Sequence, residues 1–217
     1  MMGMRALGPG VWEFAPGTEN DENEKLGSLV RLSRIPPRTR CTHRFTSWVE
    51  RDGVGEGFEA ARAFVRGEID PPFLLLYGLP GLGKTHLALA IGWNYLMWLR
   101  SVVYYQTESL LDALREGYRL QEELAPGEFH QDRYDVVMHH AMNVSLLILD
   151  DLGVEKGTEW AAAKLDAIVD YRYLEKLPMV ITANTLELSE RILDRMREGR
   201  IVRLRGQSYR KKVVQGS

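Results

Sequence analysis

The chain has 217 residues, 45% hydrophobic and 27% charged, a composition that fits a globular protein and argues against a disordered or fibrous one. Cys41 is the single cysteine, which excludes an internal disulfide and favours a reducing compartment. The net charge of −2 conceals two basic blocks, with five arginines in residues 31–44 and nine Lys or Arg in residues 191–217. Such blocks suit a solvated surface, phosphates or nucleic acid.

Targeting signals are absent from the sequence pattern. No apolar run reaches the length of about 18 residues that a membrane span needs, and the first residues lack the basic-then-apolar pattern of a secretion signal. We therefore expect a cytoplasmic protein with no membrane partner. Residues 1–34 are rich in Gly, Pro, Asn and Glu and are predicted to be flexible. Trp12 and Phe14 are exceptions in this segment, and they could pack on the body of the protein or on a partner.

Residues 35–217 are predicted to form one domain in which helices and strands alternate. In chain order, the periodicity predicts a helix over 59–65, a strand over 73–77, a helix over 85–99, a strand over 102–106, helices over 108–124 and 133–143, a strand over 144–149, a helix over 158–173, a strand over 179–182, a helix over 188–198 and a strand over 201–205. This alternation predicts an α/β fold of three layers, with a central parallel sheet and a ligand at the carboxyl ends of the strands.

Residues 78–85 read GLPGLGKT and fit the phosphate-binding pattern G-x-x-x-x-G-K-[ST]. In this pattern, backbone N–H groups wrap the β-phosphate, and glycine lets the chain come that close. Lys84 is expected to reach the β- and γ-phosphates, and the Thr85 hydroxyl to bind Mg²⁺. The predicted strand before the loop and the predicted helix after it supply the context that the pattern requires. The alternative is a chance glycine-rich turn.

The expected nucleotide is ATP, and we assign its binding to the loop together with the first residues of the helix. These residues are Gly78, Pro80, Gly81, Leu82, Gly83, Lys84, Thr85 and His86. His86 follows Thr85 on the helix, and its side chain is expected to point in another direction than that of Thr85. We therefore expect His86 to pack or to make a supporting hydrogen bond, and not to take part in catalysis.

Two carboxylates follow the apolar strand over 144–149. An acid at the tip of this strand would lie beside the glycine loop, where Asp150 can hold Mg²⁺ directly or through water. Asp151 can orient and activate the water that attacks the nucleotide. The alternative is a turn in which both acids cap the next element.

Two later segments extend this site. Asn184 ends the strand over 179–182 with a neutral amide that could hydrogen-bond the γ-phosphate or the water, although Asn also ends strands for local reasons. Arg191 and Arg195 are one helical turn apart and share a face. That face could neutralise charge on a neighbouring molecule's nucleotide, or it could be solvated and paired with Asp194 and Glu198.

Other candidates are weaker. Cys41 with His43, and His139 with His140, lack further ligands at metal spacing, so a solvated surface is the expectation for both. Tyr104, Tyr118 and Arg119 could stack on bases and contact phosphates of single-stranded DNA. The alternative places Tyr104 in the core and Tyr118 on a helix face.

The order of motifs resembles the AAA+ ATPase domain of bacterial replicative helicase loaders of the DnaC/DnaI type. The resemblance spans residues 35–210 and rests on the segments GLPGLGKTHLALAI, LLILDDLGVEKGTEW, IVDYRYLEKLPMVITAN, RILDRMREG and GQSYR. Transposase-helper ATPases of the IstB type are close relatives, and GQSYR suits them also. An IstB-like helper of a DNA transposase is therefore the alternative function.

The resemblance implies a role for each matching residue. Gly78, Gly81, Gly83, Lys84 and Thr85 would be the Walker A motif, Asp150 and Asp151 the Walker B motif, Asn184 sensor 1, and Arg195 an arginine finger that acts in trans. It also implies an AAA+ domain over residues 35–217 without a C-terminal helical lid. Such a protein would hydrolyse ATP weakly alone, because a neighbouring subunit supplies the arginine.

The implied partners are a hexameric replicative helicase, single-stranded DNA and further copies of the chain that associate through the ATP site. One departure from the family concerns the N-terminus. Loaders of this type carry a separate N-terminal domain that grips the helicase, whereas here only residues 1–34 precede the predicted domain. We therefore expect a grip through the segment around Trp12 and Phe14 or through another surface, or else a truncated or phage-like variant of such a loader.

Overall fold

A computed structural model describes residues 4–8, 11–14, 19–122, 133–153 and 158–209. Its centre is a five-stranded sheet in the order β4-β5-β6-β3-β7, and every adjacent pair of strands is parallel. The strands are β3 (Phe73–Tyr77), β4 (Val102–Gln106), β5 (Leu146–Leu152), β6 (Met179–Ala183) and β7 (Arg200–Arg203). The predicted α/β fold with a central parallel sheet is confirmed.

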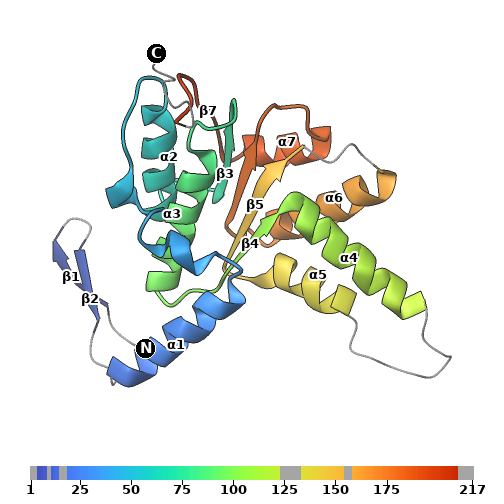
Figure 1. The fold of residues 1–217 in the computed structure, drawn as a ribbon, viewed down its shortest axis with the longest axis horizontal. Helices are drawn as coiled ribbons and strands as arrows, with labels where there is room; N and C mark the ends of the chain where they lie inside the picture. The colour runs from blue at the N-terminus through green and yellow to red at the C-terminus, as the bar shows by residue number, and fades with distance from the viewer. Residues whose placement is uncertain (1–3, 9–10, 15–18, 123–132, 154–157, 210–217) are drawn as a thin grey trace, which may run out of the picture.

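Helices cover both faces of the sheet (Figure 1). One layer contains α1 (Glu19–Leu32), α2 (Gly55–Val65) and α3 (Lys84–Met97). The other contains α4 (Thr107–Glu122), α5 (Arg133–Asn143), α6 (Glu159–Leu174) and α7 (Glu190–Arg197). Two 3₁₀ turns, η1 (Pro37–Arg40) and η2 (Phe45–Ser47), connect α1 to α2.

The strands separate two hydrophobic cores. Along β3, Leu74 and Leu76 pack into the core under α1, α2 and α3, whereas Phe73 and Leu75 pack into the core under α4 to α7. Because successive side chains of a strand point to opposite faces, a strand buried on both faces must be apolar throughout. This requirement explains the uninterrupted apolar runs in the sequence.

The register of the strands brings the candidate residues to one edge of the sheet. Tyr77 of β3 lies opposite Ala183 of β6, so the residues that follow each strand, Gly78 and Asn184, emerge together. The same edge receives Asp150, which lies opposite Gln106 of β4. Parallel strands thus place three segments, far apart in the sequence, around one point.

The segment expected to be flexible contains regular structure. β1 (Met4–Gly8) and β2 (Val11–Phe14) pair as an antiparallel hairpin, and α1 follows. Leu26, Leu29 and Val30 of α1 pack against the core, because their helical spacing forms one apolar stripe. The polar composition of the segment hid this stripe, so the helix over residues 19–32 was not predicted.

The remaining differences from the predicted elements are small. α2 begins at Gly55 rather than at residue 59, and β5 continues through Asp150 and Asp151 to Leu152. The side chains of Trp12 and Phe14 lie outside the described part of the structure, so their packing stays a prediction, as does the domain boundary after residue 34. Among the described helices, none is long and apolar enough to cross a membrane.

Candidate active site

A cavity of about 600 Å³ opens at the carboxyl edge of the sheet, around the start of α3. Its walls bring together most of the residues that the sequence selected: Pro80, Gly81, Gly83, Lys84, Thr85, His86, Asp150, Asp151 and Asn184. Leu82 is instead buried in the core and anchors the loop from below. Gly78 contributes its carbonyl oxygen, which accepts a hydrogen bond from Lys84.

Two glycines of the loop occupy positions where no side chain fits. Gly78 has a φ of 143°, and a Cβ atom there would lie 2.3 Å from the carbonyl oxygen of Leu204. Gly83 has a φ of 88°, and its Cβ atom would lie 2.7 Å from the Trp48 ring. The loop can therefore turn tightly into α3, whose N-terminus is a position where anions bind favourably.

The ammonium group of Lys84 lies inside the loop. The residue is 4% exposed, and its Nζ atom donates to the carbonyl oxygens of Gly78 (2.6 Å) and Leu79 (3.1 Å) and to Oδ1 of Asn184 (2.9 Å). A buried charge requires such acceptors. The loop thus holds one positive charge where the sequence pattern expects phosphate.

Asp150 is 1% exposed and is surrounded by hydroxyl groups. Its carboxylate accepts from Thr85 Oγ1 (3.0 and 3.1 Å), Tyr104 Oη (2.8 Å) and Thr182 Oγ1 (2.6 Å). These donors offset the cost of burying the carboxylate and fix its orientation. Burial, and then the neighbouring Asp150 carboxylate, raise the pKa of Tyr104, so its hydroxyl remains a donor.

The backbone of Asp151 adopts a left-handed conformation within β5. Its φ is 56°, and the pairing of β5 with β6 shifts register between Leu149 and Leu152. The backbone N–H of Asp151 donates to Thr182 Oγ1 at 3.0 Å, while the same hydroxyl donates to Asp150. Thr182 therefore connects the two acids, and the irregular backbone directs Asp151 to the cavity wall.

The donor set suits Mg²⁺. The Thr85 hydroxyl and the Asp150 carboxylate are adjacent oxygen ligands, and Mg²⁺ prefers one or two protein ligands of this kind, with water and phosphate completing its octahedron. Among the described residues, no group of three or more His, Cys, Asp or Glu side chains that could hold a metal ion is found.

An aromatic wall of the cavity is made of Trp48, Tyr209 and the His43–His86 pair, of which the sequence had indicated only His86 as a site residue. The Trp48 ring centroid lies 5.3 Å from that of His86 and 5.8 Å from that of Tyr209. The backbone N–H of Tyr209 donates to the Gly81 carbonyl at 2.8 Å, which ties this wall to the glycine loop. Tyr209 belongs to the GQSYR segment, which was a usable signal, whereas nothing around Trp48 indicated its position.

His86 packs and hydrogen-bonds, as expected from the sequence. Its Nε2 atom lies 3.0 Å from the carbonyl oxygen of Arg44, and its ring lies 5.0 Å from that of His43. Burial, and then the nearby His86, lower the pKa of His43. The neutral imidazole of His43 is therefore favoured beside the cavity.

Comparison with known proteins shows the family to which this chain belongs. The model of the IstB-like ATP binding proteins matches residues 59–217. The chain belongs to this family. The replicative helicase loader DnaC of Escherichia coli K12 is similar, with 30% identity over 176 residues that cover 76% of this chain and 68% of DnaC. The uncharacterized protein YdaV of the same strain is 33% identical over 221 residues, covering 94% of this chain and 85% of YdaV.

Solved structures show the same fold. A crystal structure of the DnaC helicase loader superimposes with a TM-score of 0.60 and 22% identity, covering 78% of this chain and 100% of that chain. Domain III of the replication initiation protein DnaA from Thermotoga maritima gives a TM-score of 0.66 with 20% identity, covering 80% and 69%. DnaA from Aquifex aeolicus, bound to AMPPCP, gives 0.64 with 19% identity, covering 79% of this chain and 51% of that one. This IstB-like chain therefore has a P-loop AAA+ core.

The proposed DNA contacts and the proposed arginine finger of the IstB-like chain do not all lie at the cavity. Tyr104, considered as a DNA contact or a core residue, lines the cavity and donates to Asp150, whereas the side chains of Tyr118 and Arg119 lie outside the described part. Arg195 lies on α7 in the other helical layer and is not among the residues that line the cavity. Its partner is Asp170 of α6, at 3.1 Å, rather than Asp194 or Glu198.

Proposed function

We propose that this chain is an AAA+ ATPase that loads a hexameric replicative helicase onto single-stranded DNA. The observation that carries the ATPase part is the meeting of Lys84, Thr85, Asp150 and Asn184 within hydrogen-bonding distance at one edge of the sheet. The similarity to DnaC supports the replication part.

In this proposal, ATP occupies the cavity at the start of α3. Lys84 binds the β- and γ-phosphates, and residues 78–86 surround the triphosphate through the loop backbone and the N-terminus of α3. Thr85 and Asp150 would hold Mg²⁺, whose bound charge neutralises the phosphate oxygens. Both residues already lie next to each other, so binding needs little rearrangement of the protein.

Hydrolysis requires a water in line with the γ-phosphate. Asp151 orients this water and accepts its proton, and Asn184 hydrogen-bonds the γ-phosphate or the water. Arg195 of a neighbouring copy completes the site by stabilising charge in the transition state. Arg195 is not among the residues that line the cavity of its own chain, which favours a role in trans, and hydrolysis would then depend on assembly.

We infer that the chain acts in the cytoplasm, with the helicase, single-stranded DNA and further copies of itself as partners. The second candidate function, an ATPase helper of a DNA transposase, is favoured by the IstB-like family model. A transposition helper would remodel and assemble on duplex DNA. The two functions therefore differ in the form of DNA that the protein prefers.

The test is binding to fluorescent single-stranded and duplex oligonucleotides, measured by anisotropy at low and moderate salt with and without ATP. A preference for single strands that requires ATP and is lost in Lys84→Ala is the expected result. A preference for duplex DNA would contradict the loader and support the transposase helper. Binding to neither would contradict both and leave an ATPase whose target is a protein.

A further inference from the structure

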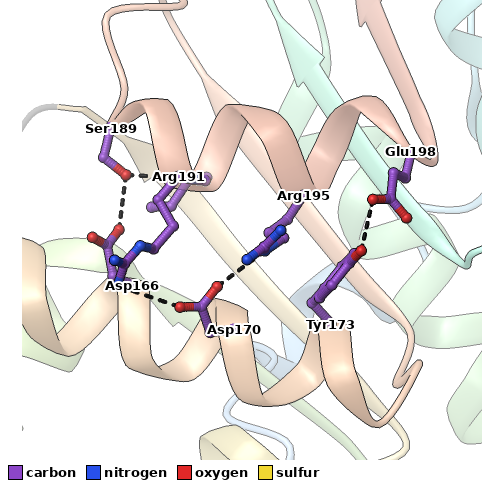
Figure 2. A network of polar contacts seen from close by, with 8 residues as sticks. Asp166, Asp170, Tyr173, Ser189, Arg191, Arg195 and Glu198 are labelled. Atoms are coloured by element: carbon purple, nitrogen blue, oxygen red, sulfur yellow. Dashed lines mark hydrogen bonds and ion pairs between the residues drawn. The ribbon is translucent and has the colours of Figure 1, made fainter.

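The arginine-bearing helix α7 is tied to α6 by a network of side chains (Figure 2). Asp170 of α6 accepts from Nε of Arg195 at 3.1 Å through Oδ1, and its Oδ2 lies 3.4 Å from Arg191 Nη1. One carboxylate therefore holds two arginines that are one helical turn apart. The start of α7 is fixed as well, because Ser189 Oγ donates to Asp166 at 2.8 Å and accepts from the backbone N–H of Ile192.

Tyr173 holds Arg195 from a second side. The guanidinium carbon of Arg195 lies 4.3 Å from the centroid of the Tyr173 ring. The ring is itself fixed, because the Tyr173 hydroxyl donates to Oε1 of Glu198 at 2.6 Å. A carboxylate on one side and an aromatic ring on the other restrict the rotamers of a long, flexible side chain.

The hydrogen bond to Asp170 does not use the Nη donors of Arg195. Asp170 takes the single N–H of Nε, whereas four of the five N–H donors of an arginine belong to the two Nη atoms. The side chains of Arg195 and Asp170 are 34% and 28% exposed, and ion pairs that accessible contribute little to stability. Orientation of Arg195 is therefore a better explanation of the network than stability.

We propose that Asp170 and Tyr173 are positioning residues for Arg195, the residue that the proposed function places in the ATP site of a second copy of this chain. The inference rests on the proposed role of Arg195 in trans. Asp170 and Tyr173 hold the guanidinium by its Nε side and its face, so that its Nη donors reach a phosphate oxygen of the neighbour's ATP. Preorganised donors of this kind cost no reorganisation at the moment of reaction.

The alternative interpretation of the same contacts is a latch. In a latch, Asp170 holds Arg195 within its own chain and keeps it away from the ATP site of the neighbouring copy. The two readings predict opposite effects for Asp170→Asn. A positioning residue makes the variant slower at saturating protein and ATP, and a latch makes it faster. Assemblies that mix two variants distinguish the two interpretations. In them, the chain that supplies Arg195 (the donor) and the chain whose ATP site receives it are different molecules.

The experiment mixes Arg195→Ala protein, whose ATP site is intact, with Asp151→Asn protein, which supplies Arg195 but does not hydrolyse ATP. We expect each to be nearly inactive alone and the mixture to hydrolyse ATP. Adding Asp170→Asn to the donor should lower the rescued turnover by on the order of tenfold with KM for ATP unchanged. Asp170→Glu should restore part of it. The matched control is Asp194→Asn in the donor, since Asp194 pairs with Arg197 on the same helix, and it should rescue fully.

Three outcomes decide the proposal. A tenfold loss that is specific to Asp170→Asn, in a donor that melts at the same temperature as its parent, supports it. Equal or greater rescue by the Asp170→Asn donor overturns the positioning role while leaving Arg195 in trans intact. No rescue by the parent Asp151→Asn donor overturns the role of Arg195 itself, and the inference with it.

Discussion

The Nζ atom of Lys84 lies 2.9 Å from Oδ1 of Asn184, although the two residues are 100 positions apart in the chain. They meet because β3 and β6 are adjacent parallel strands in which Tyr77 lies opposite Ala183. The lysine that would bind phosphate and the amide that would sense it are thus already in contact. A substitution of either residue should therefore alter the surroundings of the other.

We predict that Asn184→Ala uncouples binding from hydrolysis. Loss of one preorganised hydrogen-bonding group at a phosphoryl-transfer site should lower kcat by about 100-fold, while the remaining contacts of Lys84 with Gly78 and Leu79 should keep the Kd for ATP nearly unchanged. Single-turnover hydrolysis and titration with a fluorescent ATP analogue measure the two quantities. An unchanged kcat would remove Asn184 from the mechanism. Asn143→Ala, on α5, is the control, because Asn143 contacts Tyr171 rather than the cavity.

A second prediction concerns the hydroxyl groups around Asp150. Tyr104→Phe removes one donor and leaves Thr85 and Thr182, so the carboxylate loses one hydrogen bond to a charged group, worth roughly 1.5 kcal/mol. Turnover should fall about tenfold. Thr182→Val should be more severe, because that hydroxyl also accepts from the backbone N–H of Asp151. Steady-state ATPase assays on both variants make the comparison, and wild-type turnover in Tyr104→Phe would contradict the role given to Tyr104.

The pKa of His43 makes stability depend on pH. Burial, and then His86, lower this pKa from 6.5 in the unfolded chain, so the folded protein favours the neutral ring. As pH falls below 6.5, the unfolded chain takes up the proton first, and the free energy of unfolding drops until the folded-state pKa is passed. His43→Gln should therefore flatten the fall in Tm between about pH 7 and pH 5. Parallel Tm profiles for variant and wild type over that range would refute this assignment.

Arg172 is a structural arginine with no exposed surface. Its Nη atoms donate to four carbonyl oxygens, those of Ala141 (3.0 Å), Met142 (3.0 Å), Val144 (3.0 Å) and Pro178 (2.6 Å), and so join the end of α5 to β5 and to the entry of β6. Burial lowers the pKa of Arg172 to about 9, which leaves it charged at neutral pH.

Lysine cannot replace this planar set of donors. Arg172→Lys should lower the free energy of unfolding by about 3 kcal/mol, because the three donors of an ammonium leave at least one of the four carbonyl oxygens without a partner and lack the planar geometry that serves the others. That loss corresponds to a fall in Tm of roughly 10 °C for a chain of this length. Thermal melting measures it, and a Tm within a degree or two of wild type would show that the carbonyl oxygens find other partners.

The fold and the part of the cavity formed by the glycine loop could be predicted from the sequence, because both depend on local patterns. The apolar runs that lead to Gly78, Asp150 and Asn184 belong to the parallel strands β3, β5 and β6. Thr182 and Trp48 could not be found in this way. Thr182 is one more residue of an apolar strand until the shift in β5 brings it to both acids, and Trp48 reaches the cavity only through tertiary packing with Phe58 and Tyr209.

Helix α1 and Arg172 show two other limits. The apolar stripe of α1 was present in the sequence, but a polar composition with several acids outweighed it. Arg172 sits in a helix where an arginine is ordinarily solvated, and only the convergence of α5, β5 and β6 makes it buried. In both cases, the position of a side chain depends on the packing of distant segments.

The measurement that tests the account most directly is the ATPase rate per protomer as a function of protein concentration. Because Arg195 of one copy would complete the ATP site of another, the rate per protomer should rise with concentration, and Lys84→Ala and Asp151→Asn should abolish it. A rate per protomer that depends on Lys84 and stays constant over the whole range would show that each chain hydrolyses ATP alone. That result would contradict the shared site.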